Sequence, residues 1–115
     1  KVTVMDSVNK KTTFMQHVKS ELSLTNLNVV NGRVEEYQPT ILFDAVTSRA
    51  FSNLKNMMSL TQHTLQKNGM WLAMKSKDVK EELEAFEKNQ YTLVLLEVPF
   101  INAERYLVQL KKEVF

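Results

Sequence analysis

The sequence predicts an α/β fold, with one domain over residues 1–115 built on a mainly parallel sheet and helices on its faces. Segments with the apolar pattern of strands alternate with segments that have the four-residue spacing of helices. Runs such as LVLLEV are apolar on both sides, as strands must be when both faces of a sheet are covered. The length of 115 residues suits a single domain.

The first part of the chain predicts a strand, a helix and a second strand. VTVM (2–5) is a short apolar strand that stops at Asp6 and Ser7, two residue types that often cap helices. LNVVNGRV (27–34) is expected to be the second strand, with Gly32 at its end or at a bulge. Apolar residues about four positions apart predict the inner face of the intervening helix: Phe14, Val18 and Leu22, with Met15 beside them.

A polar loop, EEYQPT (35–40), leads to a third strand and a second helix. ILFDAV (41–46) is expected to be the strand, and Ser52 to cap the helix. Gly69 is expected to end this helix, because glycine often follows the last helical turn. The predicted inner face has apolar or small residues at helical spacing: Leu54, Met57, Met58, Thr61 and Leu65.

The last part of the chain predicts a helix and three strands. MWLAMKS (70–76) is expected to be a strand, and DVKEELEAFEK (78–88) a helix. YTLVLLEV (91–98) and ERYLVQLKK (104–112) are expected to pair antiparallel, because the short connection PFINA leaves no room for a crossover. The inner face of the helix is expected at Val79, Leu83 and Phe86.

Composition excludes several kinds of site. There is no run of 18 apolar residues, so no membrane contact is expected, and the first residues do not have the pattern of a signal peptide. The absence of cysteine excludes disulfides and thiolate sites, and His17 and His63 lack metal-ligand spacing, so no metal is expected. A net charge of +2 permits a nucleic-acid partner without requiring one. The simplest localisation is cytoplasmic.

Charged residues follow four of the predicted strands. The carboxyl ends of parallel strands share one edge, where open α/β sheets bind ligands. A carboxylate after a strand and before a helix, as at Asp6, can accept hydrogen bonds from both hydroxyls of a ribose. Each residue also has a structural alternative: Asp6 could cap a helix, and Arg49 could pair with Asp44 or Glu35. The residues at this edge are Asp6, Glu35 with Glu36, Arg49 and Lys75.

Four short stretches, taken together, resemble one known family. They are DS with a lysine at position 10, RVEE (33–36), SRAF (48–51) and the ER-LV pattern at 104–108. This combination is similar to the ribosomal RNA small-subunit methyltransferase G family, also called glucose-inhibited division protein B. The resemblance covers nearly the whole chain. It implies a Rossmann-like class I methyltransferase sheet, mostly parallel with an antiparallel strand near the carboxyl terminus.

The resemblance also implies a function. The family transfers a methyl group from S-adenosylmethionine to N7 of a guanine in 16S rRNA, so the expected partner is 16S rRNA or the small ribosomal subunit. No catalytic residue is assigned, because N7 has a free lone pair and positioning supplies most of the catalysis. The cofactor-binding residues that it implies are Asp6, Ser7, Val34, Glu35 and Arg49. The RNA-binding candidates are Lys10, Lys11, Lys75 and Arg105. Phe51 could stack on a base or lie in the core.

The sequence departs from the family at its start. The family has a Gly-rich loop after its first strand, whereas this sequence contains only two glycines and no such loop. We therefore expect the chain to be the carboxyl-terminal portion of a methyltransferase domain, lacking a strand that lies between its own first and third strands. Such a chain is expected to bind the cofactor poorly by itself. The alternative is a non-catalytic α/β module that binds RNA or another protein.

Overall fold

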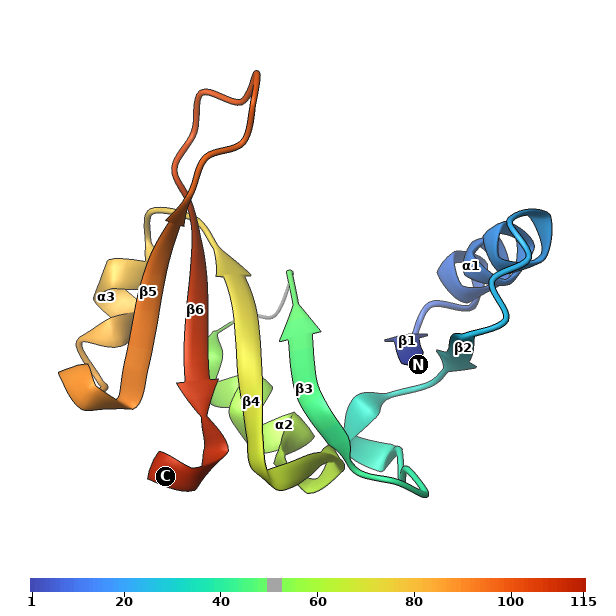
Figure 1. The fold of residues 1–115 in the computed structure, drawn as a ribbon, viewed down its shortest axis with the longest axis horizontal. Coiled ribbons are helices and arrows are strands. Elements are labelled where there is room, and N and C mark those ends of the chain that lie inside the picture. Colours follow the sequence, from blue (N-terminus) through green and yellow to red (C-terminus); the bar gives the residue numbers. More distant parts are fainter. Residues whose placement is uncertain (50–52) are drawn as a thin grey trace. The chain divides into compact units, whose positions relative to one another are not determined.

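The computed structural model describes residues 1–49 and 53–115, and these divide into two units, 1–38 and 39–115. Each unit contains its own sheet, and the strand order is shown in Figure 1. The expectations for Phe51 and for a cap at Ser52 lie outside the described residues. The two units are described below one after the other.

The first unit is a β-α-β arrangement with a parallel pair of strands. Strands β1 (Val2–Asp6) and β2 (Leu27–Asn31) pair in parallel, from Val2 opposite Leu27 to Asp6 opposite Asn31. Helix α1 (Asn9–Glu21) connects them, and the short 3-10 helix η1 (Val34–Glu36) follows β2. The predicted order is therefore confirmed. The second strand ends three residues earlier than expected, and Gly32 lies directly after it.

Helix α1 differs from the prediction at its start and on its face. Its N-cap is Val8 without a side-chain cap, so neither Asp6 nor Ser7 caps it. Phe14 is 67% exposed and Leu22 is 64% exposed, so the predicted inner face is wrong at both ends. Thr12 is the buried residue instead. Its hydroxyl donates to the Asn9 carbonyl within the helix at 3.0 Å and accepts from the Asn31 side-chain amide of β2 at 3.1 Å, so the second bond joins that face to β2.

The second unit contains a mixed four-stranded sheet in the order β3-β4-β6-β5. Strand β3 pairs with β4 in parallel, while β6 pairs antiparallel with both β4 and β5. The predicted antiparallel pair near the carboxyl terminus is thus confirmed. The strands are β3 (Phe43–Ser48), β4 (Leu65–Lys75), β5 (Tyr91–Leu96) and β6 (Arg105–Lys111).

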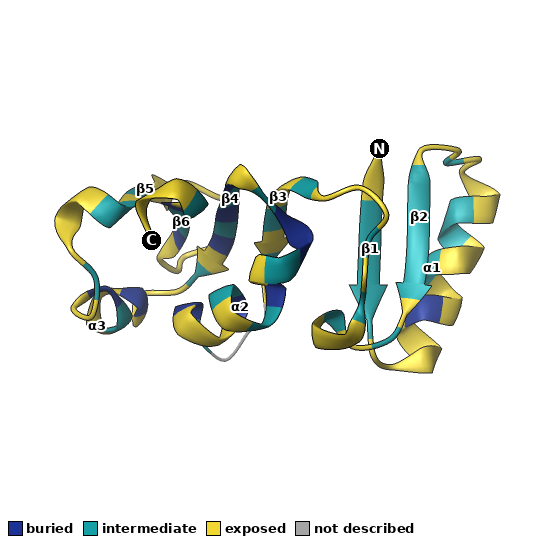
Figure 2. Ribbon diagram, turned by 90° about the horizontal axis from the view of Figure 1, so that it is seen from below, coloured by how far each residue is buried: buried dark blue, intermediate teal, exposed yellow. Residues whose placement is uncertain are grey.

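The core lies between one face of this sheet and two helices, α2 (Leu54–Thr61) and α3 (Val79–Leu83), which Figure 2 shows on the same side of the sheet. Alternate residues of the strands point into it, as strand geometry requires. Trp71 is buried there, and its indole N–H donates to the Thr61 hydroxyl at 2.9 Å. The other buried apolar residues are Leu54, Met57, Leu65, Ala73, Val79, Leu83, Tyr106, Val108 and Leu110.

Several predicted boundaries in this unit are wrong. Strand β3 lies two residues later than the predicted 41–46, and β4 begins at Leu65 rather than at residue 70. Helix α2 ends at Thr61 and Gly69 lies inside β4, so Gly69 does not end the helix and Leu65 belongs to the strand. The pairing of β3 with β4 shifts register here: Phe43 lies opposite Leu65, but Ala45 lies opposite Met70. A Cβ on Gly69 would come within 3.0 Å of the Asp44 carbonyl, so the close approach explains the glycine. Helix α3 stops at Leu83, although Phe86 still packs on the core as expected.

Candidate functional site

The carboxyl ends of β1 and β2 form one edge of the first unit. The parallel register places Asp6 beside Asn31, and both arrowheads point the same way in Figure 2. The Asp6 carbonyl accepts from the Gly32 backbone N–H at 3.0 Å and from the Asn31 side-chain amide at 3.4 Å. These bonds hold the segments that follow β1 and β2 next to each other. A ligand bound at this edge would contact both segments.

The half-buried Asp6 has a structural contact of its own. Its Oδ1 accepts a hydrogen bond from the Val8 backbone N–H at 2.8 Å, which shapes the turn between β1 and α1. This bond is not a helix cap, so the structural alternative for Asp6 is wrong in its specific form. The bond uses one of the two carboxylate oxygens. Ser7 lies exposed in the same turn.

Val34 and Glu35 lie in the short helix η1, just after β2 leaves the sheet. The turn is closed by the Glu36 N–H, which donates to the Arg33 carbonyl at 3.1 Å, and by the Tyr37 N–H, which donates to the Val34 carbonyl at 3.1 Å. Val34 is half-buried and Glu35 is exposed. The apolar side chain of Val34 and the exposed carboxylate of Glu35 therefore follow the same edge of the sheet as Asp6.

Lys10 and Lys11 are exposed in the first turn of α1, where no acidic residue accompanies them. Cations are unfavourable at this end of a helix, because the helix dipole already places positive charge there. The pair therefore adds to the positive potential next to the Asp6 turn. An anion would be attracted to this position.

Arg49 directly follows β3 and is exposed, as the sequence indicated. Among the residues described for this unit, no ion pair joins Arg49 to Asp44, so that structural alternative finds no support. Ser48, the last residue of the strand, donates its hydroxyl to the Met57 sulfur at 3.4 Å. This contact attaches the end of β3 to α2 and leaves Arg49 at the rim.

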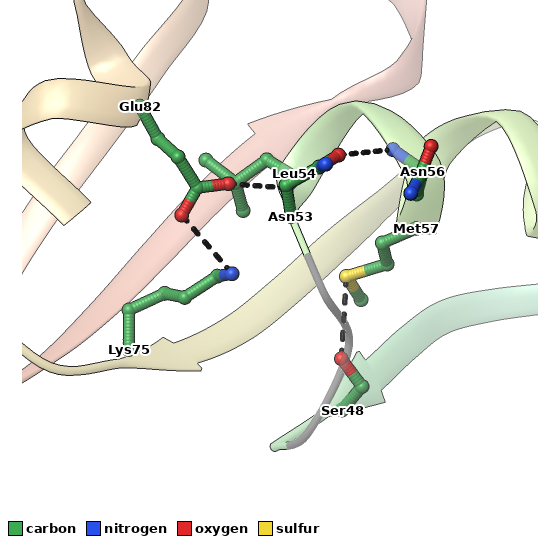
Figure 3. Close-up of polar contacts among 7 residues, drawn as sticks. All are labelled: Ser48, Asn53, Leu54, Asn56, Met57, Lys75 and Glu82. Atoms are coloured by element: carbon green, nitrogen blue, oxygen red, sulfur yellow. Dashed lines mark hydrogen bonds and ion pairs between the residues drawn. The ribbon is translucent and has the colours of Figure 1, made fainter. Parts of the chain in front are cut away.

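Lys75, the last residue of β4, is held by Glu82 (Figure 3). Its Nζ lies 3.1 Å from Glu82 Oε2, and the two side chains are only 13% and 26% exposed. Glu82 Oε1 also accepts from the Leu54 backbone N–H at 2.5 Å, which is the start of α2. The ammonium group thus has a structural role between β4, α2 and α3. Its predicted contact with RNA stays a prediction.

Sequence reasoning overlooked Glu82. The missed signal is its spacing: Glu82 lies three residues after Val79 and next to Leu83, so it borders the buried face of α3. An acidic residue on that border needs a partner. Lys75 is the cation at the neighbouring strand end.

Arg105 begins β6 and is exposed, and its guanidinium donates to the Glu104 carbonyl at 3.0 Å. Because β6 runs antiparallel to β4 and β5, this residue lies at the same end of the sheet as Lys75, near the rim that carries Arg49. The second unit therefore gathers three predicted cations at one end. The first unit separately gathers the Asp6 turn and η1. Asp6 and Glu35 belong to the first unit, and Arg49 belongs to the second.

The described residues give little support to other kinds of site. Within residues 1–49 and 53–115, no three His, Cys, Asp or Glu side chains come together to hold a metal ion. No helix in that part of the chain is long and apolar enough to cross a membrane. The groups that the two edges offer are carboxylates, cations and backbone. These groups suit a polar organic ligand and a phosphate-bearing partner.

Comparison with protein families and curated proteins gives one consistent result. The family model for rRNA small subunit methyltransferase G (GidB) matches residues 1–108. The chain is 44% identical over 114 residues to ribosomal RNA small subunit methyltransferase G of Methylobacillus flagellatus, and the match covers 99% of the chain and 56% of that protein. The protein of the same name from Hydrogenovibrio crunogenus is 42% identical, with 96% and 52% covered. The chain thus spans about half the length of these relatives.

Solved structures show the same fold at low identity. An rRNA methylase from Streptococcus thermophilus superposes with a TM-score of 0.65 at 17% identity, covering 97% of this chain and 73% of that one. Precorrin-6y C5,15-methyltransferase from Geobacter metallireducens gives a TM-score of 0.67 at 10% identity, with 97% and 67% covered. A Streptococcus mutans protein solved in complex with SAH gives 0.62 at 14% identity, with 96% and 75% covered. The fold is that of class I methyltransferases, as predicted.

Proposed function

Because the chain belongs to the rRNA small subunit methyltransferase G family, we propose that it contributes to an enzyme that transfers a methyl group from S-adenosylmethionine to N7 of a guanine in 16S rRNA. The observation that carries this proposal is the family match over residues 1–108, which includes strands and helices of both units. The two units would be two parts of one methyltransferase domain. The partner would be 16S rRNA or the small ribosomal subunit, in the cytoplasm.

The edge of the first unit would hold the adenosine part of the cofactor. The Asp6 carboxylate has an oxygen beyond the one that Val8 uses, and a carboxylate there can accept from ribose hydroxyls. Ser7 lies in the same turn, while the half-buried Val34 offers an apolar surface beside a base and Glu35 a second acceptor. These hydrogen-bond acceptors and the apolar surface therefore fit a neutral, hydroxyl-rich nucleoside.

Chemistry would need few groups from the protein. S-adenosylmethionine, when bound, supplies a methyl group that its positive sulfur already activates. Guanine N7 has a free lone pair, so the protein has no proton to remove before transfer. Its task is to hold the two reactants in line, which lowers the entropic part of the barrier. Arg49, exposed at the end of β3, would orient the cofactor or an RNA phosphate.

Cations at the two edges would bind the RNA backbone. Lys10 and Lys11 are exposed on α1, and Arg105 is exposed at the start of β6. Phosphate contacts of this kind position a nucleic acid without reading its sequence. Lys75 is the weakest of the four candidates, because Glu82 already pairs with its ammonium group.

A chimera tests the proposal. This chain would replace the matching 114 residues of the Methylobacillus flagellatus relative, and methyl transfer to small-subunit rRNA would be followed by isotope incorporation and mass mapping of the modified base. We expect S-adenosylmethionine binding and methylation at N7 of a guanine. A chimera that is folded but does not bind the cofactor would contradict the proposal and favour the non-catalytic module.

Arg49→Ala in the same chimera tests the rim of the second unit. The expected result is a large loss of methylation with an unchanged melting temperature, because the described structure gives Arg49 no ion pair with Asp44 to lose. Lys67→Ala is the matched control, since Lys67 is an exposed cation towards the opposite end of β4. Reduced stability with normal cofactor binding would instead assign Arg49 a structural role.

A further inference from the structure

We infer that Phe100, at the tip of the connection between β5 and β6, is a stacking surface for an unpaired base of the RNA substrate. This inference rests on the proposed function and adds a residue that recognises the substrate. Residues 97–104 form the connection, and Figure 1 shows it extending past the ends of β5 and β4. Strands β3, β4 and β5 run in the same direction, so the connection stands at the end where ligands of such sheets bind.

The backbone of Phe100 is in a conformation that phenylalanine rarely adopts. Its φ is 67°, in the left-handed region. The Ile101 N–H donates to the Val98 carbonyl at 3.2 Å, which closes a turn with Pro99 second and Phe100 third. Proline second with a positive φ third is the pattern of a type II turn, where glycine is favoured in the third position. The fold alone would therefore select glycine here.

The side chain of Phe100 brings no compensating burial, since it is fully exposed to solvent. A residue that is unfavourable in conformation and exposed in its apolar side chain indicates a binding role, because binding can cover the ring. Its apolar neighbours Val98 and Ile101 are 40% and 50% exposed, and neither has a ring. The tip therefore offers one exposed aromatic ring, which suits stacking on one flat base.

The base of the connection offers a cation for the adjoining phosphate. Arg105 is exposed there, and Lys77 is exposed after β4 at the same end of the sheet. Two acidic residues, Glu97 and Glu104, are the first and last residues of the same connection, and Glu104 accepts from the Tyr106 hydroxyl at 2.9 Å. The local charge is thus balanced, and stacking rather than charge would supply most of the affinity. Aromatic stacking together with a few cations is how proteins hold single-stranded RNA.

The test compares variants of this chain in binding to a fluorescently labelled, unstructured RNA oligonucleotide. Phe100→Gly should weaken binding about tenfold and should leave the melting temperature unchanged or higher, because glycine suits the turn. The loss should be equal at low and high salt. Arg105→Ala should instead reduce the salt dependence of binding by about one unit of slope. Phe100→Trp keeps a stacking ring and should bind within about twofold of the original chain.

Ile101→Ala is the matched control, because Ile101 shares the tip but has no ring. Equal binding by Phe100→Gly and the original chain would overturn the inference, as would an equal loss in Ile101→Ala, which would indicate a general apolar contact with a protein partner. The chimera separates the two proposals. Phe100→Gly there should raise the KM for RNA and leave the KM for S-adenosylmethionine unchanged. A chimera that methylates RNA equally well with Phe100→Gly would refute this inference alone, whereas a chimera that never methylates refutes the proposed function.

Discussion

Glu82 accepts from two parts of the second unit with its two carboxylate oxygens, one for Lys75 and one for the Leu54 N–H. Both partners are largely shielded from water. Glutamine keeps one acceptor oxygen but has an N–H donor in place of the other, so the substitution would remove the ion pair and leave one of the two donors without its acceptor. We expect Glu82→Gln to lower the free energy of unfolding by about 1–3 kcal/mol, measured by urea denaturation. Glu81→Gln, at the exposed neighbouring position, should change it by less than about 0.5 kcal/mol.

At the same scale, the structure changes the reading of Lys75. The family resemblance and its place at a strand end predicted an RNA contact for Lys75, but Glu82, on the buried border of α3, already pairs with its ammonium group. If Glu82→Gln lowers both the affinity for RNA and the free energy of unfolding, the ion pair of Lys75 also supports its contact with RNA. If the affinity for RNA is unchanged, Lys75 acts in the fold alone.

Thr61 joins α2 to β4 through its hydroxyl, which accepts from the Trp71 indole N–H and donates to the Met57 carbonyl at 2.5 Å. Thr61→Val keeps the shape but leaves the buried indole N–H without an acceptor. The expected cost is about 1–3 kcal/mol, and it can be followed through the fluorescence of Trp71, the single tryptophan. Thr61→Ser keeps the hydroxyl and should cost less. Equal losses in the two variants would mean that the hydrogen bond is not the cause.

Gly69 is needed where β3 and β4 change register. An added Cβ would lie 2.7 Å from Leu65 Cδ1 and 3.0 Å from the Asp44 carbonyl. We expect Gly69→Ala to destabilise the second unit by about 1–3 kcal/mol through this overpacking, seen as a lower melting temperature. Asn68→Ala, exposed and adjacent in the strand, should be close to neutral. A neutral Gly69→Ala would show that Leu65 can move aside.

Elements were predicted better than their faces and ends. The order of strands and helices followed from hydrophobic spacing, because each pattern is local. Gly69 was misread as a helix end because a glycine after an apolar helical stripe usually is one, whereas here a short 3-10 helix (Gln62–Thr64) follows α2 and β4 has already begun. Phe14 and Leu22 were misread as core because spacing alone cannot reveal that Thr12 would bond to Asn31.

At the scale of the whole molecule, burial is uneven between the units. All the buried apolar residues of the core cluster lie in residues 39–115, while the buried residue of α1 is Thr12. We expect the backbone amides of β1, β2 and α1 to exchange hydrogen faster than those of β4 and β6, because local opening is easier where little apolar surface is buried. Hydrogen exchange followed by mass spectrometry would measure this. Equal protection in both units would contradict it.

The candidate site was predicted only in its parts. The rule for carboxyl ends of strands placed Asp6, Glu35, Arg49 and Lys75 at one shared edge. In the structure each lies at or shortly after the end of its strand, but Asp6 and Glu35 belong to the first unit and Arg49 and Lys75 to the second, so their common edge stays a prediction. The resemblance supplied what spacing could not, namely the cofactor and the substrate. Neither the strand-end rule nor the resemblance predicted a role for Phe100. The feature that singles it out is its positive φ, which hydrophobic periodicity and family patterns do not reveal.

The strand order has a consequence for how the chain is made. Since β6 lies between β4 and β5, a ribosome delivers β5 before the strand that will separate it from β4. Until β6 emerges, the nascent segment TLVLL has no correct neighbour, and it combines high β-propensity with no charge and no proline. Slow translation of the connection around Phe100 would lengthen that interval. Polysomes hold several nascent chains close together, so this polypeptide would be most prone to coaggregation there.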